Sequence, residues 1–312
     1  MSLATRFSRS DSVDVWDAYF RWRDGPQLRD VTIDDTWWRV ATAAAKGDGA
    51  EAPLWAQRFV DSFSRWRMLP GENLLRTLGT HGELVAGGSL GAVLNIAAFV
   101  SRPAPTRSVF HRDTLVETAS LAVRFLDDVA ASCVVERPMR LRIGIIGLAD
   151  ALEALGLEYD SVDGRCQAAQ AAQAMAEGCL RSSVELAMER GSRLSSEDCR
   201  ACADRLRHRG MPGTLVEQAL HGLRYVSLTA IDSHPALARL ANGVADGVAD
   251  GIEKPKPMHV GGFASGRILG AELEMRAIIQ PWIDEPMDKL HRPAAAATDP
   301  ASIPTAGNGG EP

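Results

Sequence analysis

His81-Gly82-Glu83 places an imidazole and a carboxylate side by side on a glycine-rich connection. This pair offers a general base and an acid, and such connections bear functional residues more often than buried cores do. We therefore treat His81 and Glu83 as candidate catalytic residues.

A second polar group lies in the turn Asp232-Ser233-His234-Pro235, between a strand-like segment and a helix. A strand, a tight turn and a helix N-terminus are typical of a phosphate site. This turn lacks glycine, and Asp232 puts negative charge where an anion would bind. The same side chains would alternatively cap the following helix. The candidate ligand-binding residues are Ser233, His234 and Ala236.

The only close pair of thiols is Cys199 and Cys202, in the segment DCRAC. One interpretation is a redox dithiol; the favoured one is two small residues about one helical turn apart. With no second Cys/His pair nearby, we expect no zinc or other metal site.

The composition is that of an ordinary globular protein, with 312 residues, 46% hydrophobic and 24% charged. The net charge of −6 argues against nucleic acid or an anionic membrane as the main partner. No apolar run approaches the roughly 18 residues of a membrane span, and the N-terminus has no secretory apolar segment. We expect a cytoplasmic protein with its five cysteines reduced.

Hydrophobic periodicity predicts a largely helical chain that also contains strands. Thr32 and Asp35 suggest a capping box at the start of the first strong helix. The expected helices cover residues 32–46, 53–67, 113–131, 163–190, 195–208 and 270–281, with a further helix after each of the strands 141–146 and 225–229. Helices first, then strands alternating with helices, predict an α/β fold with parallel strands.

Several segments, taken together and in order, resemble the large subunit of ribonucleotide reductase, especially its adenosylcobalamin-dependent class II form. The most specific is RIGIIGLADALEALGLEYDS, which is similar to the family pattern R-x-I-G-L-G-V-x-G-L-A-D-A-L-x-x-L-G-I-x-Y-x-S. GSLGAVLNIAAFV resembles C-x-L-G-S-[IL]-N-L-A-x-x-V, and RFLDDV resembles R-x-L-D-N-V. LRYVSLTAIDSHPALARLANG is similar to L-R-N-A-x-L-T-x-I-A-P-T-G-T-I-S-x-L-A-G-N.

The sequence differs from the family pattern at the positions of the family's catalytic residues. The resemblance implies a radical-bearing cysteine on a finger loop, and the matching position holds His81, whose imidazole cannot replace a thiol as a hydrogen-atom abstractor. One reducing cysteine falls at Ser89. The family's phosphate loop becomes Ser233 to Ala236, where Pro235 replaces a glycine and removes an N–H donor.

The resemblance implies an α/β fold with high helix content, in which a helical layer precedes a partial (half) reductase-type α/β barrel. The expected division is a flexible N-terminus (1–12), a helical domain (13–80), the partial barrel (81–293) and a disordered Ala/Pro/Gly-rich tail (294–312).

Three hypotheses follow. The first is a reductase-like protein that has lost ribonucleotide reduction and acts by binding a nucleotide-like small molecule or a protein. Half a barrel leaves strand edges to cover, which predicts a homodimer or a second reductase-like chain. The second is an enzyme with a changed reaction, using His81, Glu83 and His234. The third is part of a split reductase, the one case that requires adenosylcobalamin.

Overall fold

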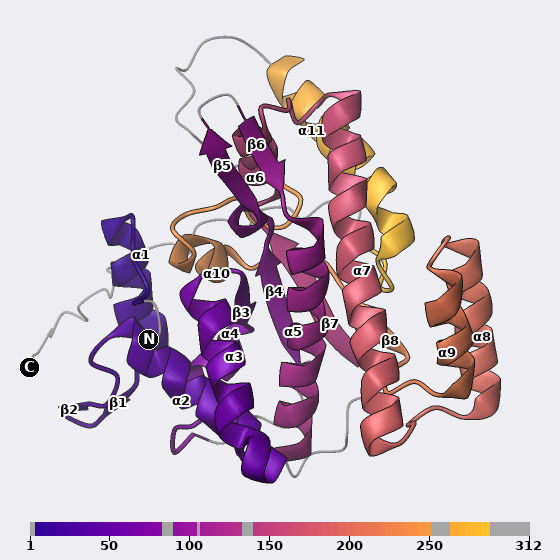
Figure 1. Cartoon of the computed structure of the whole chain (residues 1–312). Helices are drawn as coiled ribbons and strands as arrows, with labels where there is room; N and C mark the ends of the chain where they lie inside the picture. The colour runs from indigo at the N-terminus through magenta and orange to yellow at the C-terminus, as the bar shows by residue number, and fades with distance from the viewer. Residues whose placement is uncertain (1–3, 83–89, 105–106, 133–139, 251–262, 288–312) are drawn as a thin grey trace, which may run out of the picture.

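The computed structural model describes residues 4–82, 90–104, 107–132, 140–250 and 263–287 (Figure 1). It is a helix-rich α/β fold, as the sequence predicts. Glu83, Ser89, Cys133 and the tail after residue 287 lie outside these ranges. No described helix is both long and apolar enough to cross a membrane.

A four-stranded sheet in the order β3-β4-β7-β8 forms the centre of the fold. Its strands are β3 (Met68–Pro70), β4 (Gly91–Asn95), β7 (Arg140–Ile146) and β8 (Ser227–Thr229). β4, β7 and β8 run parallel, and β3 pairs antiparallel with β4. The parallel strands are therefore confirmed. The described sheet is open, so the half-barrel stays a prediction.

The N-terminal region is a helical layer against one side of the sheet (Figure 1). Thr32 caps α2 through a capping box with Asp35, as predicted. The elements are α1 (Ser10–Val15), the π-helix η1 (Trp16–Phe20), the hairpin β1 (Arg23–Asp24) and β2 (Gln27–Leu28), α2 (Ile33–Ala45), the 3₁₀-helix η2 (Lys46–Glu51), α3 (Ala52–Ser64) and α4 (Glu72–Thr77).

Two long helices, α5 (Arg112–Ser132) and α7 (Val162–Arg190), pack side by side along the sheet (Figure 1). The helices α8 (Ser196–His208) and α9 (Gly213–His221) form a hairpin with its own apolar cluster beside α7. The remaining elements are η3 (Ile96–Phe99), β5 (Val100–Ala104), β6 (Arg107–Phe110), α6 (Leu148–Leu155), α10 (Pro235–Leu240), α11 (Phe263–Ile279) and η4 (Gln280–Trp282).

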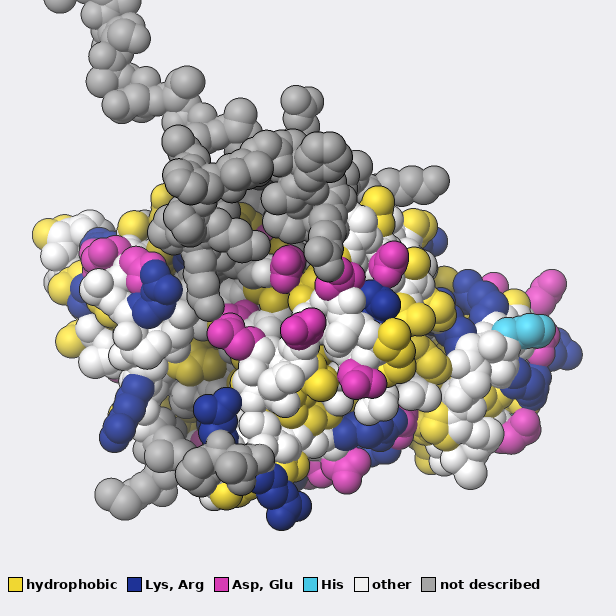
Figure 2. Space-filling model, turned by 90° about the horizontal axis from the view of Figure 1, so that it is seen from above, with side chains coloured by type: hydrophobic (Ala, Val, Ile, Leu, Met, Phe, Trp, Pro, Cys, Tyr) yellow, Lys and Arg dark blue, Asp and Glu magenta, His cyan; other side chains and the backbone are white. Residues whose placement is uncertain are grey.

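Aromatic rings join the helical layer to the long helices. Phe125 of α5 makes edge-to-face contacts with Phe59 and Phe63 of α3, at 5.3 and 5.6 Å between ring centroids. Such pairs stabilise by about 0.5–1.5 kcal/mol beyond their burial. Hydrophobic and charged side chains mix on the described part of the face seen from above (Figure 2).

Both edges of the sheet are covered by the chain itself. All three residues of β3 are buried. At the other edge, the carboxylate of Asp284 accepts hydrogen bonds from the backbone N–H groups of Leu228 (2.8 Å) and Thr229 (3.2 Å). The backbone N–H of Glu285 then donates to the Thr229 carbonyl at 3.1 Å. The described four-stranded sheet therefore has no exposed edge. The predicted partner was expected to cover such an edge, and the partner itself stays a prediction.

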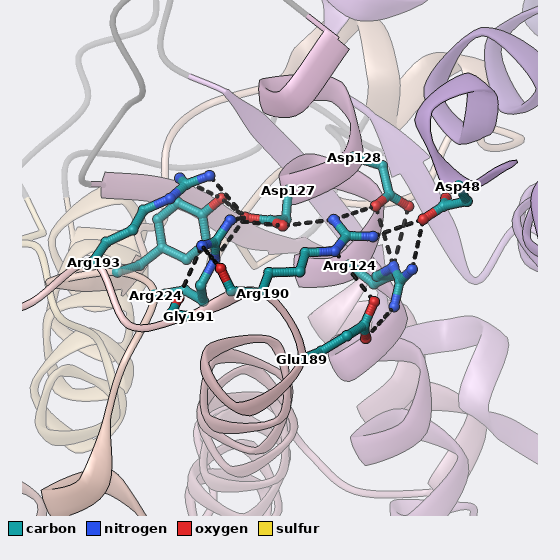
Figure 3. Close-up of polar contacts among 10 residues, drawn as sticks. Asp48, Arg124, Asp127, Asp128, Glu189, Arg190, Gly191, Arg193 and Arg224 are labelled. Carbon is teal, nitrogen blue, oxygen red and sulfur yellow. Dashed lines mark hydrogen bonds and ion pairs between the residues drawn. The ribbon is translucent and has the colours of Figure 1, made fainter.

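A buried network of ion pairs ties α5, α7 and the start of β8 together (Figure 3). Asp127 of α5 is 0% exposed and contacts Arg190 (2.7 Å) and Arg224 (3.0 Å). The hydroxyl of Tyr225 also donates to it at 2.6 Å. Burial alone would raise the pKa of Asp127, but Tyr225 and the surrounding arginines together lower it.

The neighbouring Asp128 contacts Arg190 (2.7 Å) and Arg124 (3.1 Å), and Arg124 continues the network to Asp48 of η2 at 2.7 Å. Burial raises the pKa of Asp128 to about 7, against the opposing effect of both arginines. Because Asp48 precedes α3, this network fixes the helical layer to α5 and α7.

Candidate functional site

The carboxyl ends of β4, β7 and β8 lie along one edge of the sheet because these strands are parallel. Asn95 ends β4, Gly147 follows β7, and residues 230–234 follow β8. Ligands of α/β folds bind outside this edge, so a site is expected here.

The turn after β8 is held by two carboxylates. Arg142 of β7 donates to both oxygens of Asp232, at 2.7 and 2.5 Å, and this hydrogen bonding raises the pKa of Arg142. The hydroxyl of Ser233 and the backbone N–H of His234 both donate to Asp246, at 2.5 and 2.7 Å. A hydroxyl and a backbone N–H are the donors that a bound anion would use, and here an internal carboxylate takes them.

The segment around Asp246 is fixed over the same edge. The Gly147 N–H donates to the Ala245 carbonyl, and the Ala245 N–H donates to Asp150 of α6, both at 2.7 Å. The Tyr159 hydroxyl donates to the carbonyl of Val248, and burial raises the pKa of Tyr159. Residues 244–248 therefore form part of the closed edge.

Asn95 and Gly147 meet at the ends of β4 and β7. Asn95 is 4% exposed, and its Oδ1 has no hydrogen-bond partner within the described structure. A Cβ at residue 147 would lie 2.3 Å from this oxygen, and the φ of Gly147 is +70°. Only glycine fits here, because any side chain would clash and the left-handed backbone disfavours other residues.

The backbone after β8 also covers part of one face of the sheet. Gly144 of β7 pairs with Val93 of β4, and a Cβ at residue 144 would lie 2.7 Å from the carbonyl oxygen of Ala230. The backbone that leaves β8 thus packs directly on β7, and Val93 is fully buried. Little room remains for a ligand on this part of the face.

The predicted ligand-binding residues lie in this turn, but not as a set of free donors. Ser233 and His234 are bonded to Asp246, and Ala236 lies in the first turn of α10 with no polar side chain. The predicted capping of the following helix is wrong: His234 is the N-cap residue of α10, and no side chain makes a capping hydrogen bond there.

The predicted catalytic pair lies elsewhere. The His81 side chain is 77% exposed, 3.7 Å from Asp24 and edge-on to the ring of Trp22 at 5.5 Å. It thus packs beside the β1–β2 hairpin, whereas His234 is held by Asp246. Glu83 lies outside the described residues, so its pairing with His81 stays a prediction.

The two thiols of the predicted dithiol are both buried on α8, and both are free. A guanidinium nitrogen of Arg205 lies 2.9 Å from the sulfur of Cys202, which lines a pocket of about 40 Å³ between α7, α8 and β8. Helix positions three apart have Cβ atoms about 5–6 Å apart, whereas a disulfide needs about 3.5–4.5 Å. A disulfide would therefore require α8 to deform.

Three residues that shape this edge, Arg142, Asp150 and Asp246, are not among the residues predicted from the sequence. Asp246 lies thirteen residues beyond Ser233 in the segment GVADGVAD, where no periodicity links the two. Arg142 could have been identified, because it is a charged residue within the predicted buried strand 141–146.

Residues 87–202 match the family model described as ribonucleotide reductase, barrel domain. This segment resembles that domain. It includes β4, β7, α5, α6 and α7 and therefore Asn95 and Gly147, which supports a likeness to the large subunit of ribonucleotide reductase. No curated protein matches the chain. The reductase-like match covers just over a third of the chain and ends before β8, so the turn at Ser233 lies outside it.

Proposed function

We propose that this ribonucleotide reductase-like chain does not itself reduce ribonucleotides and acts by binding. The strongest support comes from Asp246, whose carboxylate accepts hydrogen bonds from the hydroxyl of Ser233 and the backbone N–H of His234. The resemblance places a phosphate loop at this turn, and a carboxylate there repels a phosphate.

The positions of the cysteines also support this proposal. The four described cysteines lie on α7 and α8 rather than on the carboxyl edge of the sheet. Cys179 is buried, and burial raises the pKa of its thiol well above the usual value. Adenosylcobalamin in the family supplies a radical that a cysteine at the substrate must receive. The described edge holds Asn95, Ser233 and His234 instead, so these residues do not fit that cofactor's chemistry.

The direct test is a reductase assay on the full chain. The protein would be incubated with adenosylcobalamin, dithiothreitol and each ribonucleoside di- and triphosphate, and deoxyribonucleotides would be measured by chromatography. We expect no product above a heat-inactivated control. Deoxyribonucleotide formation would overturn the proposal and favour a working reductase.

The role of Asp246 can be tested by removing its charge. We expect Asp246→Asn to bind pyrophosphate in a calorimetric titration, while the wild-type chain does not. Asp150→Asn is the matched control, because it removes one negative charge from the same edge without freeing Ser233 or His234. Equal binding by both variants would show a general effect of charge. It would contradict the proposal that the Asp246 carboxylate takes the place of a bound anion.

We also propose that the binding partner is a second copy or another reductase-like chain that docks through side chains. Sheet extension is not its basis, since β3 is buried and Asp284 covers β8. Size-exclusion chromatography with light scattering should show a dimer, or a complex with a reductase-like chain added. A folded monomer under both conditions would contradict the proposed partner but not the loss of reduction.

A further inference from the structure

A serine and a histidine meet at the base of the β5–β6 hairpin, away from the carboxylates of the proposed binding turn. The Oγ of Ser101 lies 2.6 Å from Nε2 of His111. Both residues are exposed. This distance is within the range of a nucleophile that gives its proton to a general base.

The backbone holds both residues in place. Ser101 pairs with Val109 across the hairpin, and the N–H of His111 donates to the carbonyl of Phe99 at 2.8 Å. The hydroxyl of Ser108 donates to the carbonyl of Ala154 at 2.7 Å, which anchors the hairpin on α6. The pair therefore lies on packed elements rather than on a free loop, as catalytic groups require.

His111 also marks the start of a long helix. Its carbonyl accepts from the N–H of Leu115 at 3.1 Å, and α5 continues for 21 residues. The first N–H groups of a helix have no acceptor within the helix, and this end carries partial positive charge. These donors begin at Arg112, the residue after the base, and N–H groups of this kind stabilise the oxyanion of an acyl-transfer reaction.

We propose that Ser101 is a catalytic nucleophile, activated by His111, that accepts the acyl group of an activated carboxylic ester. Nε2 of His111 takes the Ser101 proton as Oγ attacks the ester carbonyl. The bond to the leaving oxygen then breaks, and this oxygen receives the proton from His111. Water attacks the acyl-serine ester in the same way, which releases the carboxylic acid and returns the proton to Ser101.

The surroundings indicate the class of substrate. The pair lies on the surface, so it suits the acyl end of a small or extended ester rather than an enclosed molecule. Arg107, two residues before Val109 on β6, is an exposed cation. It favours esters whose leaving group carries negative charge.

A fluorophosphonate probe tests the proposal, because it phosphonylates activated serines covalently. The full chain would be labelled in its folded state, and the modified residue identified by mass spectrometry. We expect labelling at Ser101, none there in Ser101→Ala, and labelling slower by about 100-fold or more in His111→Gln, which removes the general base. Ser196→Ala is the control, since it removes an exposed serine hydroxyl on α8 that has no part in holding the hairpin, and it should label as the wild type does.

A second measurement separates turnover from labelling. With p-nitrophenyl acetate, the wild type and Ser196→Ala should release about one equivalent of nitrophenol rapidly and then turn over slowly, as expected of an acyl-serine. Circular dichroism would show that the variants are folded. No labelling of the wild type, labelling at another serine, or an unchanged rate in His111→Gln would each overturn the proposal.

Discussion

The two ends of the sheet both use arginine–aspartate pairs, but in different surroundings. At the amino end of β8, Asp127 is fully buried among arginines. Beyond the carboxyl end of β8, Asp232 pairs with Arg142 of β7, and both side chains are about one-third exposed. The first group therefore holds helices together, whereas the second shapes a surface. Changes at the two ends should therefore have effects of different size.

The largest expected effect is at Asp127. Asp127→Asn leaves buried guanidinium groups without their anion, and we expect a loss of about 3–5 kcal/mol in the free energy of unfolding. Tyr225→Phe, which removes the hydroxyl that donates to Asp127 and accepts from Arg193, should cost about 1–2 kcal/mol. Urea denaturation measures both. The control is Asp204→Asn, since Asp204 pairs with Arg207 on the surface and its loss should cost under about 1 kcal/mol.

Asp128 should make the stability depend on pH. Its pKa of about 7 in the folded chain exceeds the ordinary aspartate value, so the folded state holds the proton more tightly. This contribution is complete below about pH 4 and is lost as the pH rises through 7, by an amount of the order of 4 kcal/mol. Asp128→Asn, the residue in the family pattern at this position, should flatten that part of the profile. Urea denaturation from pH 4 to 8 measures the free energy of unfolding of both proteins. An equal dependence on pH in the wild type and in Asp128→Asn would contradict this prediction.

Gly147→Ala should cost about 2–3 kcal/mol, from the left-handed backbone and the clash with Asn95. Gly156 is a matched control, because its φ is +76° but a Cβ there meets nothing within 4 Å. Gly156→Ala should therefore show the backbone cost alone. If the two substitutions cost the same, the Asn95 contact does not constrain this edge. Adding Asn95→Ala should relieve Gly147→Ala specifically.

The smallest effect is expected at Arg142. Arg142→Ala removes a partly exposed ion pair with Asp232, which should lower the free energy of unfolding by up to about 1 kcal/mol. Urea denaturation at low and high salt measures it, with the difference shrinking as salt screens the pair. A loss as large as that of Asp127→Asn would mean that both ends of the sheet serve stability equally.

The long elements could be predicted from the sequence, and the short ones could not. Helices expected at 113–131 and 163–190 are α5 and α7, because many turns of apolar periodicity define them. The strands β3, β5 and β6 have only three to five residues each, which is too short to show a period. Within the candidate site, the sequence predicts that the turn at Ser233 lies between a strand and a helix. Its bond to Asp246 was not predicted, because tertiary contacts and not spacing bring the two together.

The carboxylate of Asp284 on the backbone of β8 has a consequence for solubility. Open strand edges recruit other chains into growing β-sheets, and proteins suppress this by occupying or charging the edge. Here one side chain occupies two of the N–H groups that an incoming strand would need. The short segment after η4 thus protects the molecule from edge-to-edge aggregation, although it contributes no strand to the fold.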